Sequence, residues 1–357
     1  MIRAALKWVG TLLLFAAVAF CFLPTLVPPF LDRVYYQGPP GAHFDGSHFF
    51  NPDLPSPGRA DPRRILNRWV SGERAIWPDR VAVRQTVPPR RVPGGDMLVT
   101  WIGHSTVLVQ TRSLNILTDP IWSERASPFS FVGPRRVRAP GVPFEDLPRI
   151  DLVLVSHNHY DHMDLPTLRR LWDRDRPLIV TSLGNDTILR GAGIESAARD
   201  WGGSVAVRPD IAVFVERNHH WGSRWGSDRN RALWSAFTIR LPGGNIFFAG
   251  DTGWGDGAWV HAAARRAPFR LAILPIGAYL PRDIMRDSHI GPAQALRIFE
   301  ILRPVRALAV HWGTFQLAFD AIDDPPRTLA ALKRERGIAP GLFAVTEVGQ
   351  TFRVPAR

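Results

Sequence analysis

The chain has 357 residues, a length that allows one large domain or two smaller ones with an ample core. Its formal net charge of +12 favours anionic partners such as lipid headgroups or nucleic acid, although charge does not decide a fold. The only cysteine, Cys21, excludes a disulfide bond within the chain.

The N-terminus carries a long apolar stretch. Residues 8–31 contain no charged side chain over 24 positions, and Arg3 and Lys7 precede them. At about 1.5 Å per helical residue this run is long enough to span a bilayer, and the preceding cations favour a cytoplasmic N-terminus. A cleaved signal peptide is the alternative, but no A-x-A site follows, and Phe20 before Cys21 is a poor lipoprotein context. We therefore expect residues 1–31 to form an uncleaved single-pass anchor, with the domain that follows on the periplasmic side of a bacterial inner membrane.

Residues 32–95 are rich in proline and glycine and contain one helical candidate, residues 62–70. This composition predicts a tether and an arm that lies over the following domain. We expect that domain to occupy residues 96–357.

Two strands are predicted between Met97 and Val109, interrupted by a tight turn at Gly103-His104-Ser105. A structural role for His104 is at least as plausible as a functional one, so it is not counted as a metal ligand. The next predicted strand, 115–119, ends on Asp119, a carboxylate suited to hold a ligating histidine.

A loop at residues 123–149 follows, and it holds five arginines among prolines and glycines. A solvated loop is the default interpretation, and a lip that attracts phosphate is the alternative. The arginines are Arg125, Arg135, Arg136, Arg138 and Arg149.

The most informative stretch begins with an apolar run, Ile150 to Val155, which predicts a buried strand. Four side chains that bind divalent metals come directly after it: His157, His159, Asp161 and His162. Neighbouring side chains point apart, so four ligands this close do not easily serve one tetrahedral ion. Two adjacent metals, each taking alternate members, fit the spacing better than a histidine-rich surface loop does.

The rest of the chain repeats this pattern. Helices are predicted at 165–173, 292–302 and 326–336, and strands at 177–181, 211–215, 232–241, 245–249, 271–275 and 305–310. Apolar strands end at His157, just before His220, at Asp251 and at His311. Helices between strands predict a layered α/β domain whose helices cover both sides of paired sheets.

These segments resemble a known family. Ser156-His-Asn-His-Tyr-Asp-His is similar to the signature of the metallo-β-lactamase superfamily of binuclear metallohydrolases, which implies a four-layer αββα sandwich. Within that superfamily, residues 97–320 resemble the N-acylphosphatidylethanolamine-hydrolysing phospholipase D branch. The matching segments are Thr118-Asp-Pro-Ile-Trp-Ser, Leu183-Gly-Asn, His220-Trp, Phe248-Ala-Gly-Asp-Thr-Gly, Pro275-Ile-Gly-Ala-Tyr and His311-Trp-Gly-Thr-Phe.

The resemblance implies two zinc ions per chain. The first would be held by His157, His159 and His220, the second by Asp161, His162 and His311, with Asp251 bridging both. His219 is the rival to His220. Diiron redox relatives carry glutamate where this chain has His159, which favours zinc and hydrolysis.

The resemblance also implies the reaction, cleavage of N-acylphosphatidylethanolamine to phosphatidic acid and an N-acylethanolamine. Asp161 and Asp251 would act with the metals, and His289 would protonate the leaving group, unless it is a surface residue that caps a helix. The chain differs from that family at its N-terminus, where a membrane-spanning stretch replaces a peripheral arm. We expect a membrane phospholipid as substrate and the bilayer as partner; the sequence leaves the oligomeric state open.

Two alternatives remain. One is another hydrolase of the same fold that acts on a lactone, a β-lactam or a cyclic phosphodiester. The other is a non-catalytic, basic protein that binds nucleic acid. The complete ligand set and the lack of an aromatic-basic recognition motif argue against the second, so no nucleic-acid partner is expected.

Overall fold

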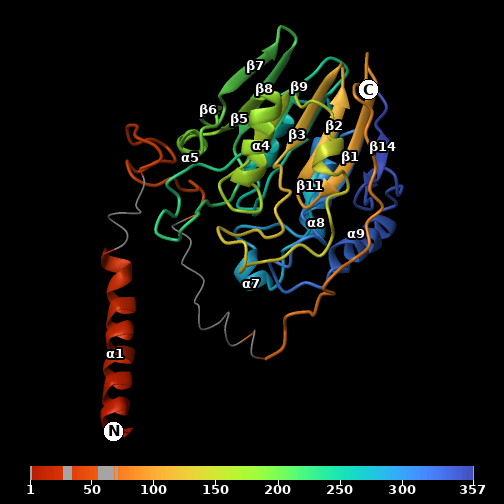
Figure 1. Ribbon diagram of the computed structural model, residues 1–357. Coiled ribbons are helices and arrows are strands. Elements are labelled where there is room, and N and C mark those ends of the chain that lie inside the picture. Colours follow the sequence, from red (N-terminus) through yellow and green to blue (C-terminus); the bar gives the residue numbers. More distant parts are fainter. Residues whose placement is uncertain (1, 27–33, 55–67, 69–70, 357) are drawn as a thin grey trace.

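A computed structural model describes residues 2–26, 34–54, 68 and 71–356. Its body consists of two seven-stranded sheets, and helices lie on their outer faces (Figure 1). This arrangement is the expected α/β sandwich of four layers, αββα.

The first sheet has the strand order β14-β1-β2-β3-β4-β5-β6. Neighbours from β14 to β3 are antiparallel, and neighbours from β3 to β6 are parallel. The strands are β1 (Met97–Gly103), β2 (Thr106–Thr111), β3 (Leu114–Thr118), β4 (Leu152–Val155), β5 (Leu178–Ser182), β6 (Ala197–Arg199) and β14 (Thr351–Arg353).

The second sheet has the order β13-β12-β11-β10-β9-β8-β7, in which β10 to β13 are parallel and β7 to β10 are antiparallel neighbours. Its strands are β7 (Ser204–Arg208), β8 (Ile211–Glu216), β9 (Ala236–Arg240), β10 (Asn245–Phe248), β11 (Phe269–Pro275), β12 (Arg306–Val310) and β13 (Phe343–Ala344).

Helices complete the two outer layers. The first sheet is covered by α4 (Leu165–Asp175) and α5 (Asn185–Gly191). The second is covered by α6 (Ala258–Ala264), α8 (Pro292–Leu302) and α9 (Asp324–Glu335). Two shorter elements, a 3₁₀ turn (Phe144–Asp146) and α7 (Arg282–Met285), lie in loops.

The alternation of side chains along β4 shows how the sequence builds the layers. Leu152 and Leu154 belong to the core between the sheets, whereas Val153 and Val155 pack under the helical layer with Leu168 of α4. Because successive strand residues point to opposite faces, a strand buried on both sides must be apolar throughout. The uninterrupted Leu-Val-Leu-Val run of β4 meets this requirement.

Strand direction places several strand ends at one edge of the sandwich. β10, β11 and β12 are parallel, and β8 runs the same way because it is separated from β10 by the antiparallel β9. Their carboxyl ends therefore lie together, and the loops that follow β3 and β4 meet them from the first sheet. Ser235 N–H, for example, donates to the Ser156 carbonyl oxygen at 3.0 Å.

The predicted elements agree with the structure over most of the domain. The turn between β1 and β2, the hairpin of β9 and β10, and helix α8 at 292–302 all occur as expected. β9 begins only at Ala236, four residues later than predicted, because the backbone of Leu233 bonds instead to the Leu183 carbonyl oxygen.

The N-terminal helix α1 (Ile2–Leu26) stands apart from the sheets in Figure 1. Its exposed side chains include seven large apolar ones: Trp8, Val9, Leu12, Leu13, Leu14, Phe15 and Val18. Within the described part of the chain, no helix meets the length and apolarity needed to cross a membrane. Positions 1 and 27–31 of the expected anchor, and all of the helical candidate 62–70 except Arg68, lie outside the described residues.

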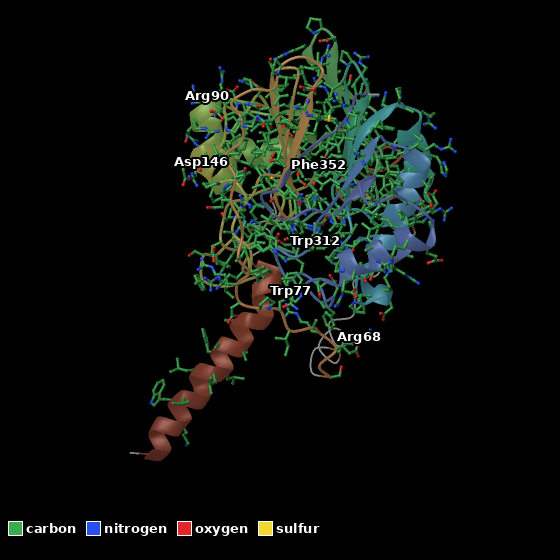
Figure 2. The ribbon with its side chains drawn as sticks, turned by 90° about the vertical axis from the view of Figure 1, so that its right-hand side faces the viewer. Arg68, Trp77, Arg90, Asp146, Trp312 and Phe352 are labelled. Atoms are coloured by element: carbon green, nitrogen blue, oxygen red, sulfur yellow. The ribbon has the colours of Figure 1, made fainter. Side chains whose placement is uncertain are left out.

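The described part of the arm contacts the domain. Asn51 donates from Nδ2 to the His220 carbonyl oxygen at 2.8 Å, and Trp77 donates from Nε1 to the Asp320 carbonyl oxygen at 2.8 Å. Figure 2 shows Trp77 at the lower end of the body.

Candidate metal centre

Six of the seven predicted ligands are buried, and all seven converge where the two sheets meet. They follow the ends of β4, β8, β10 and β12, so each is held by a short segment anchored in a sheet. The structure thus brings together His157, His159, Asp161, His162, His220, Asp251 and His311.

Three histidines form one half of the cluster. His157 Nε2 lies 2.8 Å from His159 Nδ1, and His220 Nε2 lies 3.3 Å from the same atom. Three ring nitrogens that face one point are the donor set of a histidine metal site.

The other half contains Asp161, His162 and His311. Asp161 Oδ2 lies 3.1 Å from His162 Nε2 and 3.5 Å from His311 Nε2. Asp251 stands between the halves, with Oδ2 3.0 Å from His311 Nε2, 3.2 Å from His162 Nε2 and 4.0 Å from His220 Nε2. The Asp251 carboxylate therefore faces both halves of the cluster.

The donor atoms suit a cation because several of them have no hydrogen-bond partner. His162 Nε2, His311 Nε2 and Asp251 Oδ1 are buried without one, although other polar atoms lie nearby. An unsatisfied buried polar atom costs about 1–3 kcal/mol. A divalent cation would satisfy all of them at once, and imidazole with carboxylate is a donor set that binds one.

The opposite ring nitrogens are fixed by neighbours. Asp119 Oδ2 lies 2.6 Å from His162 Nδ1 and also accepts a 2.6 Å hydrogen bond from the Ser156 hydroxyl. The Ser288 carbonyl oxygen lies 2.8 Å from His220 Nδ1. An Nδ1 proton donated to these acceptors leaves Nε2 free to bind a metal, which is the role expected of Asp119.

His104, which was not counted as a ligand, belongs to the cluster. Its Nε2 lies 2.8 Å from Asp161 Oδ2, and its carbonyl oxygen accepts the backbone N–H of His311 at 3.0 Å. It therefore touches two members of the second half. The sequence held one signal for this contact, a histidine beside a tight turn between two predicted strands.

The backbone around the cluster is held in an uncommon conformation. His104, Asp119 and His311 have positive φ angles of 53°, 33° and 61°, values that cost free energy in non-glycine residues and gather at functional sites. Gly250 before Asp251 has φ 59°, and a Cβ there would lie 2.8 Å from Ser156 Cβ, so this approach of the two sheets requires glycine.

Electrostatics separates the histidines into two groups. Burial lowers the pKa of His157 and His220 well below the ordinary value, and lowers that of His159 to about 4. Burial also disfavours the charged forms of His162 and His311, but the nearby carboxylates outweigh this effect. They raise the pKa of His162 well above its ordinary value and that of His311 to about 9.

Both carboxylates are held ionised. Burial alone would raise the pKa of Asp161 and Asp251, but the charge of His162 overrides it and holds both values well below the ordinary one. A pair of ionised carboxylates is what divalent cations need as ligands.

His289 lies at the rim of the cluster, with Nδ1 3.7 Å from Asp251 Oδ2 and its ring 5.2 Å from that of His220. Burial lowers its pKa to about 4, so the ring is neutral at pH 7. His219 faces elsewhere: its Nδ1 lies 2.8 Å from the Asp287 carbonyl oxygen and its Nε2 3.6 Å from Asp53.

Two of the five arginines in the loop at residues 123–149 do not form the phosphate-attracting lip that was considered as an alternative. Arg136 donates to the carbonyl oxygens of Ser123 and Ile121, and Arg138 donates to that of Gly313. Both are buried, so their guanidinium groups satisfy loop backbone and do not face solvent. That interpretation was wrong for Arg136 and Arg138.

The comparisons with known proteins identify the family. Residues 114–312 match the model of the beta-lactamase superfamily domain. The chain belongs to this superfamily. It is therefore a metal-dependent hydrolase of the metallo-β-lactamase fold, in agreement with the His/Asp cluster.

The relatives confirm the narrower resemblance. The chain is 31% identical over 313 residues to N-acyl-phosphatidylethanolamine-hydrolyzing phospholipase D 1 of Caenorhabditis elegans, an alignment that covers 83% of this chain and 88% of the relative. It is also 31% identical over 258 residues to the mitochondrial N-acyl-phosphatidylethanolamine-hydrolyzing phospholipase D of Saccharomyces cerevisiae, covering 71% of this chain and 55% of the relative.

Solved structures support the fold. A metallo hydrolase from the archaeon Ignicoccus hospitalis superposes with a TM-score of 0.55 at 22% identity, covering 73% of this chain and all (100%) of the other. An isothiocyanate hydrolase from Delia radicum gut bacteria superposes with a TM-score of 0.57 at 21% identity, covering 72% of this chain and 98% of the other.

Proposed function

We propose that this chain is a phospholipase D-type phosphodiesterase that binds two zinc ions and cleaves N-acylphosphatidylethanolamine to phosphatidic acid and an N-acylethanolamine. The observation that carries the proposal is the 31% identity to a phospholipase D of this type across 88% of its length. The convergence of the seven candidate ligands supports it.

The two halves of the cluster assign the ligands. His157, His159 and His220 would hold one zinc ion, and Asp161, His162 and His311 the other. Asp251 would bridge them, because its Oδ2 faces both halves. Nitrogen donors dominate the first half, which favours zinc over metals that prefer oxygen ligands.

The bound zinc pair would supply positive charge against the phosphodiester and lower the pKa of a water nucleophile. The chain's own residues do the rest. Asp161 and Asp251 stay ionised in this buried setting and fix the separation of the two donor groups. Asp119 orients His162, and the Ser288 carbonyl oxygen orients His220, so neither ring can turn away.

His289 is proposed to assist departure of the leaving oxygen. Because its low pKa keeps the ring neutral at pH 7, it would act by donating an N–H hydrogen bond to that oxygen and would not carry a stored positive charge. Its place at the rim, next to Asp251, would put it beside a substrate phosphate held between the metals.

We further propose that the N-terminus anchors the enzyme in the inner membrane, with the catalytic domain in the periplasm. The uncharged run of 24 residues after Arg3 and Lys7 supports this proposal. A tethered domain meets lipid headgroups at high effective concentration. Protease added to intact spheroplasts should digest the domain, and complete protection would reverse the orientation.

The activity can be tested with the zinc-loaded full chain in mixed micelles that contain N-acylphosphatidylethanolamine, phosphatidylcholine, a lactone or a cyclic phosphodiester. Mass spectrometry should detect phosphatidic acid and N-acylethanolamine as the dominant products. Asp251→Asn should abolish turnover, whereas Asp210→Asn, at an exposed turn between β7 and β8, should not change it. Faster turnover of the lactone or the cyclic substrate would reject the proposed substrate.

A further inference from the structure

One stretch of the catalytic body exposes aromatic side chains. Among the described residues from 34 to 356, the exposed phenylalanines and tryptophans are Phe129 (47% exposed), Phe131 (77%) and Trp225 (48%). Val132 next to them is 52% exposed. These four residues are called the apolar lip below. Exposed apolar side chains gathered at one place on a surface mark an interaction site.

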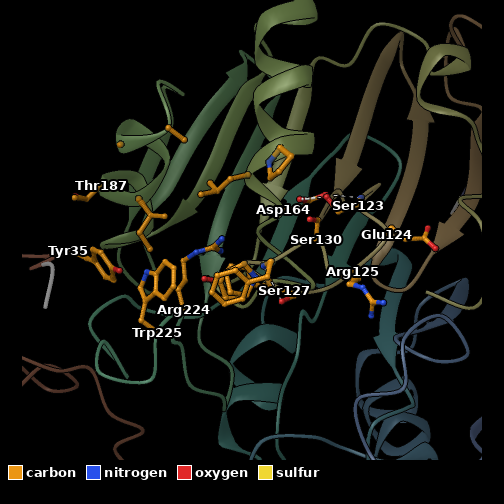
Figure 3. A pocket seen from close by; sticks show the side chains of 18 residues that line it. Tyr35, Ser123, Glu124, Arg125, Ser127, Ser130, Asp164, Thr187, Arg224 and Trp225 are labelled. Atoms are coloured by element: carbon orange, nitrogen blue, oxygen red, sulfur yellow. Dashed lines mark hydrogen bonds between the residues drawn. The ribbon is translucent and has the colours of Figure 1, made fainter. Parts of the chain in front are cut away.

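The apolar lip borders a cavity of about 550 Å³, and Phe129 and Trp225 line it. In Figure 3 Trp225 and Arg224 stand on one side of this cavity, and Ser127 and Ser130 on the other. Phe131 packs against Phe129, with ring centroids 5.5 Å apart.

The cavity adjoins the metal-binding segment without including any candidate ligand. Two of its lining residues, Tyr160 and Asp164, belong to the segment that carries His157 to His162. Trp225 lies against Tyr160, with ring centroids 6.5 Å apart. A molecule held at the lip would therefore contact the segment that carries four of the candidate ligands.

The loop that carries Phe129, Phe131 and Val132 is bonded at its base to the metal-binding segment. Asp164 accepts hydrogen bonds from the backbone N–H groups of Trp122 and Ser123 and from the Ser123 hydroxyl at 2.8 Å. The loop is further closed by Arg125, which donates to the Gly133 carbonyl oxygen at 2.6 Å. The exposed tip thus projects from a fixed base, which suits a contact made by insertion.

We propose that the apolar lip inserts into the interfacial layer of an anionic phospholipid bilayer and holds the mouth of the cavity against the membrane. Three observations favour a bilayer over a protein partner. Tryptophan and phenylalanine prefer the membrane interface. The chain carries a net charge of +12, which attracts anionic lipids. Helix α1 of the same chain exposes apolar side chains as well.

This inference deepens the proposed function, because it names the surface through which a lipid substrate is presented. It also separates two roles: α1 would tether the chain, and the lip would orient the domain. Arg135 lies close to the lip in sequence, with its side chain 61% exposed and paired with Glu124.

The test measures the depth of the lip in a membrane and needs no turnover. The full chain with Cys21→Ser is labelled at Val132→Cys with a fluorophore and reconstituted into liposomes of phosphatidylethanolamine and phosphatidylglycerol. Ile76→Cys provides the matched control, because Ile76 is 97% exposed and does not line the cavity. Brominated lipids should quench most of the fluorescence at position 132 and leave that at position 76 nearly unchanged.

Equal quenching at the two positions would overturn the inference. Self-quenching of the label at position 132 in lipid-free protein would also overturn it, because it would show that the lip contacts a second copy of the chain. If the label at position 132 is not quenched but N-acylphosphatidylethanolamine is still turned over, the membrane contact of the lip is rejected and the proposed function is not. Strong quenching without that turnover would reject the substrate and leave the membrane contact standing.

A triple variant, Phe129→Ser with Phe131→Ser and Val132→Ser, provides a second measurement. It should raise KM for substrate in vesicles while kcat on a water-soluble nitrophenyl phosphodiester stays at the wild-type value. The soluble substrate shows whether the variant is folded, since it needs the metal centre but not the lip. Wild-type KM on vesicles in a folded variant would overturn the inference.

Discussion

At the scale of single residues, the candidate metal centre depends on which ring nitrogen each histidine presents. The Ser156 hydroxyl lies 2.9 Å from His157 Nδ1, Asp119 holds Nδ1 of His162, and the Ser288 carbonyl oxygen holds Nδ1 of His220. Each contact directs Nε2 into the cluster. Partners of this kind set the tautomer and orientation of a ligand, and removing one weakens metal binding.

His104 should act as a positioning residue for the second metal. Without its contact to Asp161 Oδ2, that carboxylate can rotate, so we expect His104→Ala to weaken the second of two zinc binding steps by roughly 10–100-fold. A competitive zinc titration should show the first step unchanged. His104→Gln should recover part of the affinity, since its amide can still donate to Asp161. Equal weakening of both steps would mean that His104 serves the fold in general.

His289 should matter most where the leaving group needs help. On a substrate with a poor alkoxide leaving group, His289→Ala should lower kcat by about 10²-fold or more. On a nitrophenyl phosphodiester, whose leaving group departs as a stable anion, the loss should be small. Comparable losses on the two substrates would remove His289 from the chemistry of the leaving group.

At the scale of elements, the loop after β8 clamps the metal-binding segment. Arg224 donates from Nη1 to the carbonyl oxygens of Asn158 and Met163 at 3.0 and 2.9 Å, and its guanidinium lies 3.9 Å from the Tyr160 ring centroid. These contacts brace the segment at both ends. Burial lowers the pKa of the Arg224 side chain, but the group stays charged at neutral pH.

Replacing this clamp should loosen the ligand segment. Arg224→Met preserves the volume but leaves two carbonyl oxygens without a donor, so we expect a loss of about 2–4 kcal/mol in the free energy of unfolding. Zinc should restore part of this loss, because bound metal holds the same segment. Urea unfolding with and without zinc would measure both effects. Arg190→Met, at an exposed site on α5 where the arginine pairs with Asp186, is the control; an equally small effect for both variants would contradict the clamp.

Much of the site could be predicted because its signals are local. His157 to His162 lie within six positions after an apolar strand, and β8, β10 and β12 also end close to a candidate ligand. The parallel strands then bring these ends to one edge. Short strands such as β6 and β14 were missed, since three residues give no periodicity to read.

What could not be predicted depends on contacts distant in sequence. His104 meets Asp161 across 57 positions, and nothing near Gly103 reveals that partner. Arg136 and Arg138 look like solvent-facing cations in a loop, but they donate to backbone carbonyl oxygens, Arg136 to Ile121 within its own loop and Arg138 to Gly313 of a distant one. Tertiary hydrogen bonding thus decided the positions that the local pattern left open.

At the scale of the whole molecule, the stability of the metal-free protein should fall in acid. Burial holds the pKa of His104 at about 3, below the unfolded value of about 6.5. Between these values the unfolded chain binds a proton that the folded chain does not, so stability drops as pH falls, by on the order of 2 kcal/mol at pH 5 for this group. The other depressed histidines add to this loss.

His311 has the opposite effect over another range. Its pKa of about 9 means that the stability it contributes is complete below about pH 6.5 and is lost as pH rises through 9. The chelated protein should therefore be most stable near pH 6–7, as measured by urea unfolding across the pH range. A stability that keeps rising toward pH 5 would contradict the assigned environments of these histidines.

The central claim is a pair of metal ions held by one buried cluster. The most direct measurement is anomalous diffraction at the zinc edge from crystals of the zinc-loaded protein. We expect two peaks about 3.5–4 Å apart, one among His157, His159 and His220 and the other beside Asp161, His162 and His311, with Asp251 contacting both. A single peak, or two peaks without Asp251 between them, would contradict it.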